Sequence, residues 1–219
     1  LSWSRHHRSF PGQGELPVGA FLRDVLAAGY RGPLSLEIFN DEFRSAPARR
    51  IARDGLRGLV WAEEAAGVAE PPAPPALSGV ESVEFAVDGA AAEELGAFLA
   101  TLGFRVAGRH RSKAVALWRQ GGVNFVLNAE PDSFAQDFGR RHGPSACAMA
   151  FRVADAEAAM ARAVSLGAKP FKGRNGPGEL DNPAIEGIGG SLLYFVDRYG
   201  AKGSIYDVDF RWVDGANPK

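Results

Sequence analysis

The second half of the sequence contains an internal repeat, which constrains the fold more than any other feature. An alternating run at residues 83–88 leads into an alanine-rich helical stretch, and a similar run at 149–155 does the same roughly 65 residues later. Strand-like runs follow the first helix at 104–109, 114–119 and 123–128, and the second at 169–171, 192–196 and 203–209. Each repeat is therefore predicted to be βαβββ. The expected strand core consists of Phe85, Val87, Phe125, Phe151, Val153, Tyr194 and Phe195.

A proline-rich stretch separates this repeat from the front of the chain. Residues 68–78 contain Pro-Pro-Ala-Pro-Pro, a composition typical of an extended polyproline spacer. We therefore predict a first domain at 1–67, a linker at 68–78, a second domain at 79–213 and a tail at 214–219.

The first domain is predicted to be a helix, a strand and a helix. Helical apolar periodicity occupies residues 18–28 and 47–66, and residues 33–40 alternate with the period of a strand. This order with short connections is typical of an α/β fold with parallel strands. The helices are expected to bury Phe21, Leu22, Val25 and Leu26 in the first, and Ala52, Leu56, Leu59 and Val60 in the second.

Glu37 is the candidate functional residue of this strand. It alternates with Leu36 and Ile38 and lies just before the turn residues Asn40 and Asp41, near the strand's C-terminal end. Catalytic residues of (β/α)8 barrels occupy such positions. A carboxylate that points inward is costly unless it is paired, protonated or bound to a metal. Both a metal ligand and a glutamate held by an arginine fit this position.

The loop before the first helix carries Arg5, His6, His7 and Arg8. This cluster is either a solvated basic loop or a site that grips an anion, because arginine forks match carboxylates and phosphates. Adjacent histidines on an extended chain point to opposite faces, which argues against both ligating one metal ion.

Composition excludes several classes of function. The net charge of −1 gives no electrostatic reason to expect nucleic acid or an anionic membrane as partner. No apolar run approaches the ~20 residues of a membrane span. The single cysteine, Cys147, excludes an intramolecular disulfide and favours a reducing compartment, so we expect a cytoplasmic protein. The chain starts with Leu1 and lacks a signal-peptide core, and we expect it to be a segment of a longer protein.

Three stretches resemble known families. Residues 197–210 (DRYGAKGSIYDVDF) resemble the N-terminal, non-catalytic half of 4-hydroxyphenylpyruvate dioxygenases, and the paired βαβββ repeats resemble a vicinal-oxygen-chelate domain. Residues 4–14 and 34–41 resemble the end of a xylose-isomerase-like sugar phosphate isomerase/epimerase barrel. In this order they resemble bacterial 3-dehydroshikimate dehydratases. The implied fold is α+β, with the C-terminal end of a (β/α)8 TIM barrel followed by a vicinal-oxygen-chelate domain.

The resemblance implies a lyase that removes water from 3-dehydroshikimate to give protocatechuate. A divalent cation (Mg, Mn or Co) would stabilise an enolate, with Glu37 matching the ligand from the last barrel strand. Ser4 and Arg8 match residues that line the substrate. The catalytic base and the remaining ligands would lie outside this segment, so the chain by itself is expected to be inactive.

Other functions fit the same sequence. The chain could belong to a 4-hydroxyphenylpyruvate dioxygenase-type protein as its non-catalytic N-terminal half, or to a sugar phosphate isomerase/epimerase of another specificity. The second domain is expected to bind no metal and to act as a scaffold or a dimer contact. A dimer contact would make the protein a homo-oligomer. Alignment of its repeats on the superfamily's ligand positions gives Glu84 in the first repeat, Ala148 in the second and Ile205–Tyr206 late in the chain.

Overall fold

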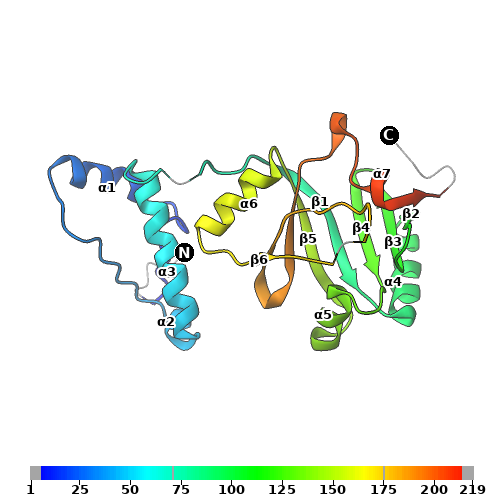
Figure 1. Ribbon diagram of the computed structural model, residues 1–219. Helices are drawn as coiled ribbons and strands as arrows, with labels where there is room; N and C mark the ends of the chain where they lie inside the picture. The colour runs from blue at the N-terminus through cyan, green and yellow to red at the C-terminus, as the bar shows by residue number, and fades with distance from the viewer. Residues whose placement is uncertain (1–5, 71, 175, 214–219) are drawn as a thin grey trace. The chain divides into compact units, whose positions relative to one another are not determined.

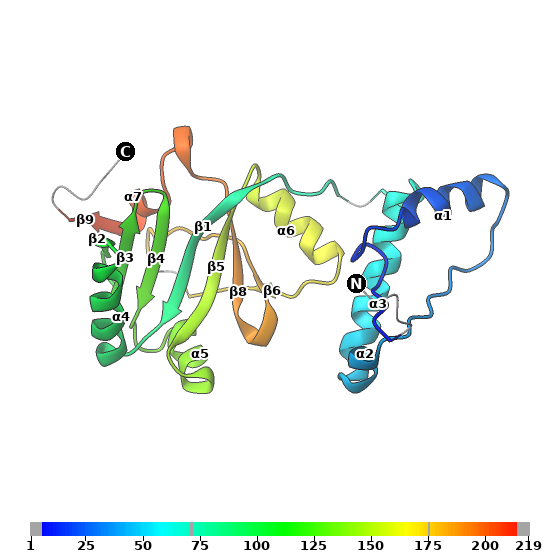
Figure 2. The ribbon, with the colours of Figure 1, turned by 180° about the vertical axis from the view of Figure 1, so that it is seen from behind.

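The computed structural model describes residues 6–70, 72–174 and 176–213. The chain divides into two compact units, Leu1–Ala73 (unit 1) and Pro74–Lys219 (unit 2), and the division falls inside the proline-rich stretch. Both units are seen in Figures 1 and 2, and each is described here by itself.

Unit 1 consists of three helices: α1 (Val18–Ala27), α2 (Asp41–Ser45) and α3 (Ala48–Ala65). Helix α1 packs on the end of α3 through a small core of Leu22, Ala62 and Ala66. The contact is close because Gly19 has no side chain, and an added Cβ there would lie 2.6 Å from the Cβ of Ala65. The two long helices therefore agree with the sequence-based prediction to within one residue at each end.

The buried face of α3 differs from the predicted stripe. Its buried positions are Gly55, Gly58 and Ala62, whereas Ala52 is exposed and Leu56 is 61% exposed. Phe10, which is buried, covers the two glycines, since an added Cβ at Gly58 would lie 3.2 Å from its Cβ. The stripe prediction was wrong at these positions because the loop packs on the flat glycine face of α3.

The strand predicted at residues 33–40 is extended but is not a strand. Among the described residues, its ladder contact is one antiparallel bridge between His7 and Asn40. Side chains alternate as predicted, with Leu36 and Ile38 half-buried and Glu37 exposed. A strand also needs backbone partners along its length, which the described part of unit 1 does not supply.

Unit 2 is built on one nine-stranded mixed sheet in the order β6-β7-β8-β5-β1-β4-β3-β2-β9. The first repeat supplies β1 to β4 and the second supplies β5 to β8, joined where β1 pairs antiparallel with β5. The strands are β1 (Leu77–Ala86), β2 (Arg105–His110), β3 (Val115–Gln120), β4 (Val123–Asn128), β5 (Ser145–Val153), β6 (Pro170–Phe171), β7 (Ala184–Glu186), β8 (Leu192–Val196) and β9 (Phe210–Trp212).

Two helices cover one face of this sheet. Helix α4 (Gly89–Thr101) packs on the first repeat, in a cluster with Val87 and Leu127, and α6 (Ala156–Ser165) packs on the second, with Val153 and Phe195. Helix α5 (Phe134–His142) contacts β1 and β5. The opposite face holds the even-numbered side chains of β1 and β4, and part of it borders a cavity.

The end of the second repeat differs from the prediction. Residues 203–209 were expected to form a strand, but they turn into the short helix α7 (Tyr206–Asp209). Ser204 explains the change: its hydroxyl accepts from the backbone N–H of Tyr206, and its own N–H donates to Asp207 Oδ2. The repeat is completed instead by β7, which the sequence analysis missed, and β9 crosses back to pair with β2 of the first repeat.

Candidate functional site

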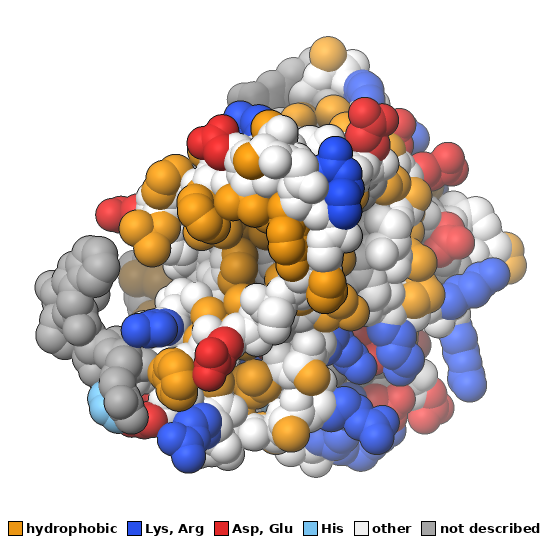
Figure 3. All heavy atoms as spheres, turned by 90° about the vertical axis from the view of Figure 1, so that its left-hand side faces the viewer, with side chains coloured by type: hydrophobic (Ala, Val, Ile, Leu, Met, Phe, Trp, Pro, Cys, Tyr) orange, Lys and Arg blue, Asp and Glu red, His pale blue; other side chains and the backbone are white. Residues whose placement is uncertain are grey.

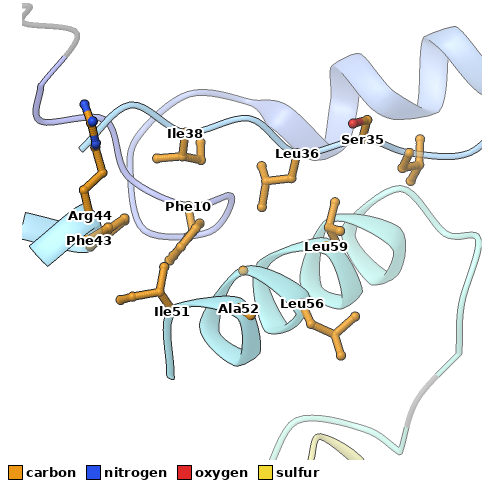
Figure 4. A pocket seen from close by; sticks show the side chains of 12 residues that line it. Phe10, Ser35, Leu36, Ile38, Phe43, Arg44, Ile51, Ala52, Leu56 and Leu59 are labelled. Atoms are coloured by element: carbon orange, nitrogen blue, oxygen red, sulfur yellow. The ribbon is translucent and has the colours of Figure 1, made fainter. Parts of the chain in front are cut away.

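The extended segment presents Glu37 on its outer side. Leu36 and Ile38 point toward α3, as Figure 4 shows, and Glu37 lies between them in the chain with its side chain exposed. Because successive side chains of an extended segment point to opposite sides, Glu37 and Phe39 share the side away from α3. Burial of the apolar positions thus fixes which way the carboxylate faces.

Arg8 lies on that same side. Its backbone N–H donates to the carbonyl oxygen of Phe39 (3.2 Å), and its guanidinium carbon lies 5.7 Å from the centre of the Phe39 ring. Asn40 Nδ2 donates to the carbonyl oxygen of Arg8 (2.9 Å). The structure therefore brings two of the three predicted site residues, Arg8 and Glu37, to one side of the segment. Ser4, the third, lies outside the described residues.

His6 and His7 help to hold this loop in place. His6 Nδ1 lies 2.9 Å from Asp41 Oδ2, its carbonyl oxygen accepts from the backbone N–H of Asp41, and His7 forms the bridge to Asn40. Asn40 in turn caps α2, since its Oδ1 accepts from the N–H groups of Glu42 and Phe43. The described part of the basic cluster is thus anchored on the start of α2.

An apolar groove of about 510 Å³ lies between the extended segment and α3. In Figure 3, hydrophobic side chains gather around a hollow on this side of the molecule. Figure 4 shows the groove at close range, with Phe10, Leu36 and Ile38 on one side and Ile51 and Leu59 on the other. Phe10 stacks on Phe43 at one end, with ring centres 4.6 Å apart. The groove is lined by side chains that proteins usually bury.

Unit 1 does not assemble a metal site from its own described residues. A divalent ion of the expected kind needs several oxygen or nitrogen ligands. Within the described parts of the chain, no group of three or more His, Cys, Asp and Glu side chains is placed to hold one. Glu37 can therefore be no more than one ligand of a larger set.

In unit 2 the aligned positions of the two repeats come together around one cavity. Glu84 and Ala148 are direct cross-strand partners of β1 and β5, and Glu84, Ile205 and Tyr206 line the cavity. Asn128 Nδ2 donates to Glu84 Oε1 (2.6 Å). One carboxyl opposite an alanine, already bonded to an amide, does not form a three-ligand site, and no group of three or more His, Cys, Asp and Glu side chains among the described residues of unit 2 is placed to form one.

A second polar cluster of unit 2 escaped the sequence analysis. Glu81 is 5% exposed, pairs with Arg152 Nε at 2.5 Å and, through Oε1 and its carbonyl oxygen, accepts from Asn124 Nδ2. Asn124 Oδ1 accepts in turn from Arg119 Nε (2.7 Å), whose guanidinium lies over the rings of Tyr206 and Trp212. The bond between Glu81 and Arg152 joins residues that are 71 positions apart in the sequence. No short-range spacing in the sequence predicts such a network.

The family model for hydroxyphenylpyruvate dioxygenase, N-terminal, matches residues 72–211. This range covers nearly all of unit 2. The chain belongs to that family. A 4-hydroxyphenylpyruvate dioxygenase from Pseudomonas aeruginosa is 50% identical to this chain over 143 residues, which cover 65% of this chain and 40% of that protein.

Other relatives match both units. A protein named 3-dehydroshikimate dehydratase from Pseudomonas putida is 52% identical over 224 residues, or 96% of this chain, and one of the same name from Pseudomonas aeruginosa is 51% identical over the same share. The chain spans about a third of the length of these relatives (35%).

A solved structure also matches both units. A xylose isomerase-like TIM barrel/4-hydroxyphenylpyruvate dioxygenase fusion protein matches 98% of this chain and 36% of that chain, with a TM-score of 0.85 and 50% identity. The fold is thus α+β, in which a segment that matches such a fusion protein precedes a dioxygenase-type domain. No helix in the described ranges is long and apolar enough to cross a membrane.

Proposed function

We propose that this chain is part of a 3-dehydroshikimate dehydratase, a lyase that removes water from its substrate. The observation that carries the proposal is how far the similarities extend. Dioxygenase relatives match about 65% of the chain, whereas both dehydratases match 96% of it, unit 1 included. A protein that was a dioxygenase alone would leave unit 1 unmatched.

In this proposal unit 1 is the last part of a barrel whose other strands come from the rest of the protein. The extended segment at 33–40 supports it, because the segment has strand alternation but lacks strand neighbours among the described residues. The groove beside α3 supports it too, since its apolar lining needs a cover. A neighbouring barrel strand and its helix would supply both.

Glu37 and Arg8 would line the active site of that barrel. The exposed carboxylate of Glu37 is a suitable ligand for a divalent cation together with ligands from other strands, and such an ion would act as a Lewis acid on substrate oxygens. Arg8 lies on the same side, held over Phe39, where its planar guanidinium could grip a substrate carboxylate through two parallel hydrogen bonds. Ser4 would donate a further hydrogen bond.

The test of Glu37 uses the full-length protein that contains this chain. The variant Glu37→Gln should fold normally, because the side chain is exposed, and should lose metal and dehydratase activity together. Glu42→Gln, an equally exposed change five positions along, is the matched control and should keep both. Normal metal content in purified Glu37→Gln would show that Glu37 is not a ligand.

Arg8→Lys separates a bidentate contact from a simple positive charge. Lysine keeps the charge but not the fork, so kcat/KM should fall while metal content stays unchanged. Wild-type kinetics for this variant would show that Arg8 does not contact the substrate.

The 219-residue chain alone should not turn over 3-dehydroshikimate, and measurable turnover would contradict the assignment of unit 1 as an incomplete barrel.

Unit 2 is proposed to lack a catalytic metal and to serve the protein as a scaffold. The position of Glu84 opposite Ala148 and its hydrogen bond from the Asn128 amide support this. Elemental analysis of the 219-residue chain tests the absence of a catalytic metal, and near-stoichiometric iron, manganese or zinc retained after chelation would contradict it.

We also propose a cytoplasmic location, which fits a single cysteine that is buried and forms no disulfide.

A further inference from the structure

Unit 2 has a partly open cavity of about 210 Å³ on the face of its sheet that α4 and α6 do not cover. The floor is formed by Glu84 of β1, Asn128 of β4, Ala150 of β5 and Tyr194 of β8, so both repeats contribute. The chain between β6 and β7 passes across this face of the sheet, as Figure 1 shows, and its residues 179–182 form part of the wall.

We call residues 176–183 the strap, and its contacts fix it over the cavity. Glu179 accepts from Ser112 Oγ (3.0 Å) and from Lys113 Nζ (2.5 Å), both in the loop between β2 and β3. The backbone N–H of Leu180 donates to Asp209 Oδ1 (3.2 Å). A segment of the second repeat is thus tied to the first repeat, and the cavity is pre-formed in the way that small-molecule sites usually are.

The titratable groups around the cavity include one ion pair, one neutral imidazole and two further acids. Lys113 is paired with Glu179, whose side chain is 12% exposed. His110 is held neutral, because its Nδ1 accepts from the backbone N–H groups of Ser112 and Lys113, both at 3.2 Å, which places the ring proton on Nε2. Burial lowers the pKa of His110, while the nearby Glu179 acts in the opposite direction. Two further acids, Asp181 and Asp209, line the cavity and disfavour an anion, and Asp209 Oδ1 accepts from the backbone N–H of Leu180.

Glu84 is the polar group on the floor. Burial raises the pKa of its carboxyl, and this outweighs the hydrogen bond from Asn128 and the charge of Lys113, which both act to lower it. The neutral acid that burial favours carries a donor as well as an acceptor. Asn128 takes up Oε1, which leaves the acid's hydroxyl to donate to a ligand oxygen.

We propose that this cavity binds a small uncharged ring compound with one hydroxyl or carbonyl oxygen, and that Glu84 and Asn128 together anchor that oxygen. The size fits, since a cavity of about 150 Å³ holds benzene and this one is somewhat larger. Phe171, Tyr194 and Phe210 give aromatic walls for the ring. The inference concerns unit 2 alone and does not depend on the dehydratase proposal.

The test is a titration of the isotope-labelled 219-residue chain with phenol, followed by amide NMR. Saturable shifts are expected at residues that line the cavity, such as Ala150 and Val126. Benzoate and benzylammonium, rings of similar size with opposite charges, should bind more weakly than phenol. Absence of saturable shifts at these residues would overturn the proposal, and tighter binding of either charged probe would overturn the assignment of an uncharged ligand.

Variants of Glu84 test the anchor. Glu84→Leu should weaken phenol binding about tenfold, as expected for the loss of one hydrogen bond. Glu84→Gln should bind within about threefold of wild type, because an amide keeps one donor and one acceptor as a neutral acid does. Glu93→Leu makes the same change at an exposed position of α4 and should bind as wild type does.

Each result of these variants bears on the proposal. If Glu84→Leu does not fold, the phenol titration of the wild-type chain still decides whether the cavity binds the ring, and Glu84→Gln still tests the protonated form of the carboxyl. A loss in Glu84→Gln of more than about tenfold would show that the ionised carboxylate, and not the neutral acid, binds the ligand. Unchanged binding in a folded Glu84→Leu would remove Glu84 from the site.

Discussion

The two units bury their apolar side chains to very different extents. Unit 1 has one small core around Leu22, Ala62 and Ala66, and it leaves Phe21 69% exposed and Leu56 61% exposed. Unit 2 packs four clusters around its sheet, in which Leu117 and Leu192 are fully buried. The sequences of both units nevertheless show clear apolar periodicity.

This difference separates periodicity from burial. An apolar stripe indicates which face of a helix or strand can be buried. Whether that face is buried depends on a second element that packs against it. In unit 2 the repeats supply partners to each other across the pairing of β1 with β5. In unit 1 the stripe of α3 and the alternation at 33–40 meet only around an open groove. Unit 1 thus leaves much of its apolar stripe uncovered, whereas unit 2 buries the facing sides of its strands and helices.

The largest expected effect is a leucine deletion made once in each unit. Leu117→Ala should lower the free energy of unfolding by about 2–5 kcal/mol, because it leaves a void in the buried cluster that contains Tyr206 and Phe210. Leu56→Ala should change it by less than about 0.5 kcal/mol, since the side chain is exposed. Urea unfolding of the 219-residue chain measures both. Equal losses would mean that the groove of unit 1 is closed in solution.

The next effect depends on pH and concerns the strap of unit 2. Burial alone would raise the pKa of Glu179, but hydrogen bonds from Lys113, Gly176 and Ser112 outweigh it and hold the pKa at about 2. Because the folded-state pKa lies below the usual 4.5, the carboxylate stabilises the fold fully above about pH 4.5, and this contribution is lost as the pH falls toward 2.

Glu179→Gln should therefore cost roughly 2 kcal/mol at pH 7 and very little near pH 2. Unfolding curves of wild type and variant across that range give the comparison. Glu186→Gln, which removes a more exposed ion pair with Lys169, is the control and should cost less than about 1 kcal/mol at any pH. A loss in Glu179→Gln that does not vary with pH would show that the ion pair is not formed.

A smaller effect is expected where α1 meets α3 in unit 1. Gly19→Ala places a methyl group 2.6 Å from the Cβ of Ala65, which costs about 1–3 kcal/mol, while alanine favours the helix by about 1. The net loss of about 1 kcal/mol should appear as faster amide exchange in α1. Gly14→Ala, which faces open space, should leave exchange unchanged. Unaltered exchange in Gly19→Ala would mean that α1 is not docked on α3.

The smallest effect concerns a hydroxyl in the core of unit 2. Tyr206 Oη is buried beside Ser82 and Glu81, and among the described residues it has no partner at good hydrogen-bonding geometry. Removing a buried polar group that has no partner is close to neutral or stabilising, so Tyr206→Phe should change the free energy of unfolding by less than about 0.5 kcal/mol. A loss above about 1 kcal/mol in thermal unfolding would show that the hydroxyl is bonded to a nearby group.

The parts of the fold that sequence predicted are those set by local patterns. The ranges 123–128 and 192–196 match β4 and β8, and α1 and α3 begin and end within a residue of expectation. Predictions failed where a contact from elsewhere decided the outcome. Phe10 covers the glycine face of α3 from outside the helix, whereas the turn before α7 (Tyr206–Asp209) is a local exception, set by Ser204 and Asp207. Neither contact leaves a periodic trace in the sequence.

The candidate sites, too, were predicted where a local pattern sets them and missed where distant segments form them. Alternation correctly put Glu37 on the side opposite Leu36 and Ile38, and the structure adds Arg8 beside it through the Phe39 contact. Their roles remain predictions. The cavity of unit 2 was missed, although Glu84 was singled out, because its walls come from both repeats and from a strap that ties Glu179 to Lys113, 66 positions away.

The crossing of β9 to the edge of β2 has a consequence for the order in which unit 2 folds as it is synthesised. The partner of β2 is made about 100 residues after β2 itself, which at ribosomal speeds is roughly 5–20 s. During that interval the outer backbone groups of β2 have no strand beside them, and such an edge invites pairing with other chains. Nascent chains of this protein should depend most on chaperones in that window, and the dependence should end when residues 210–212 leave the exit tunnel.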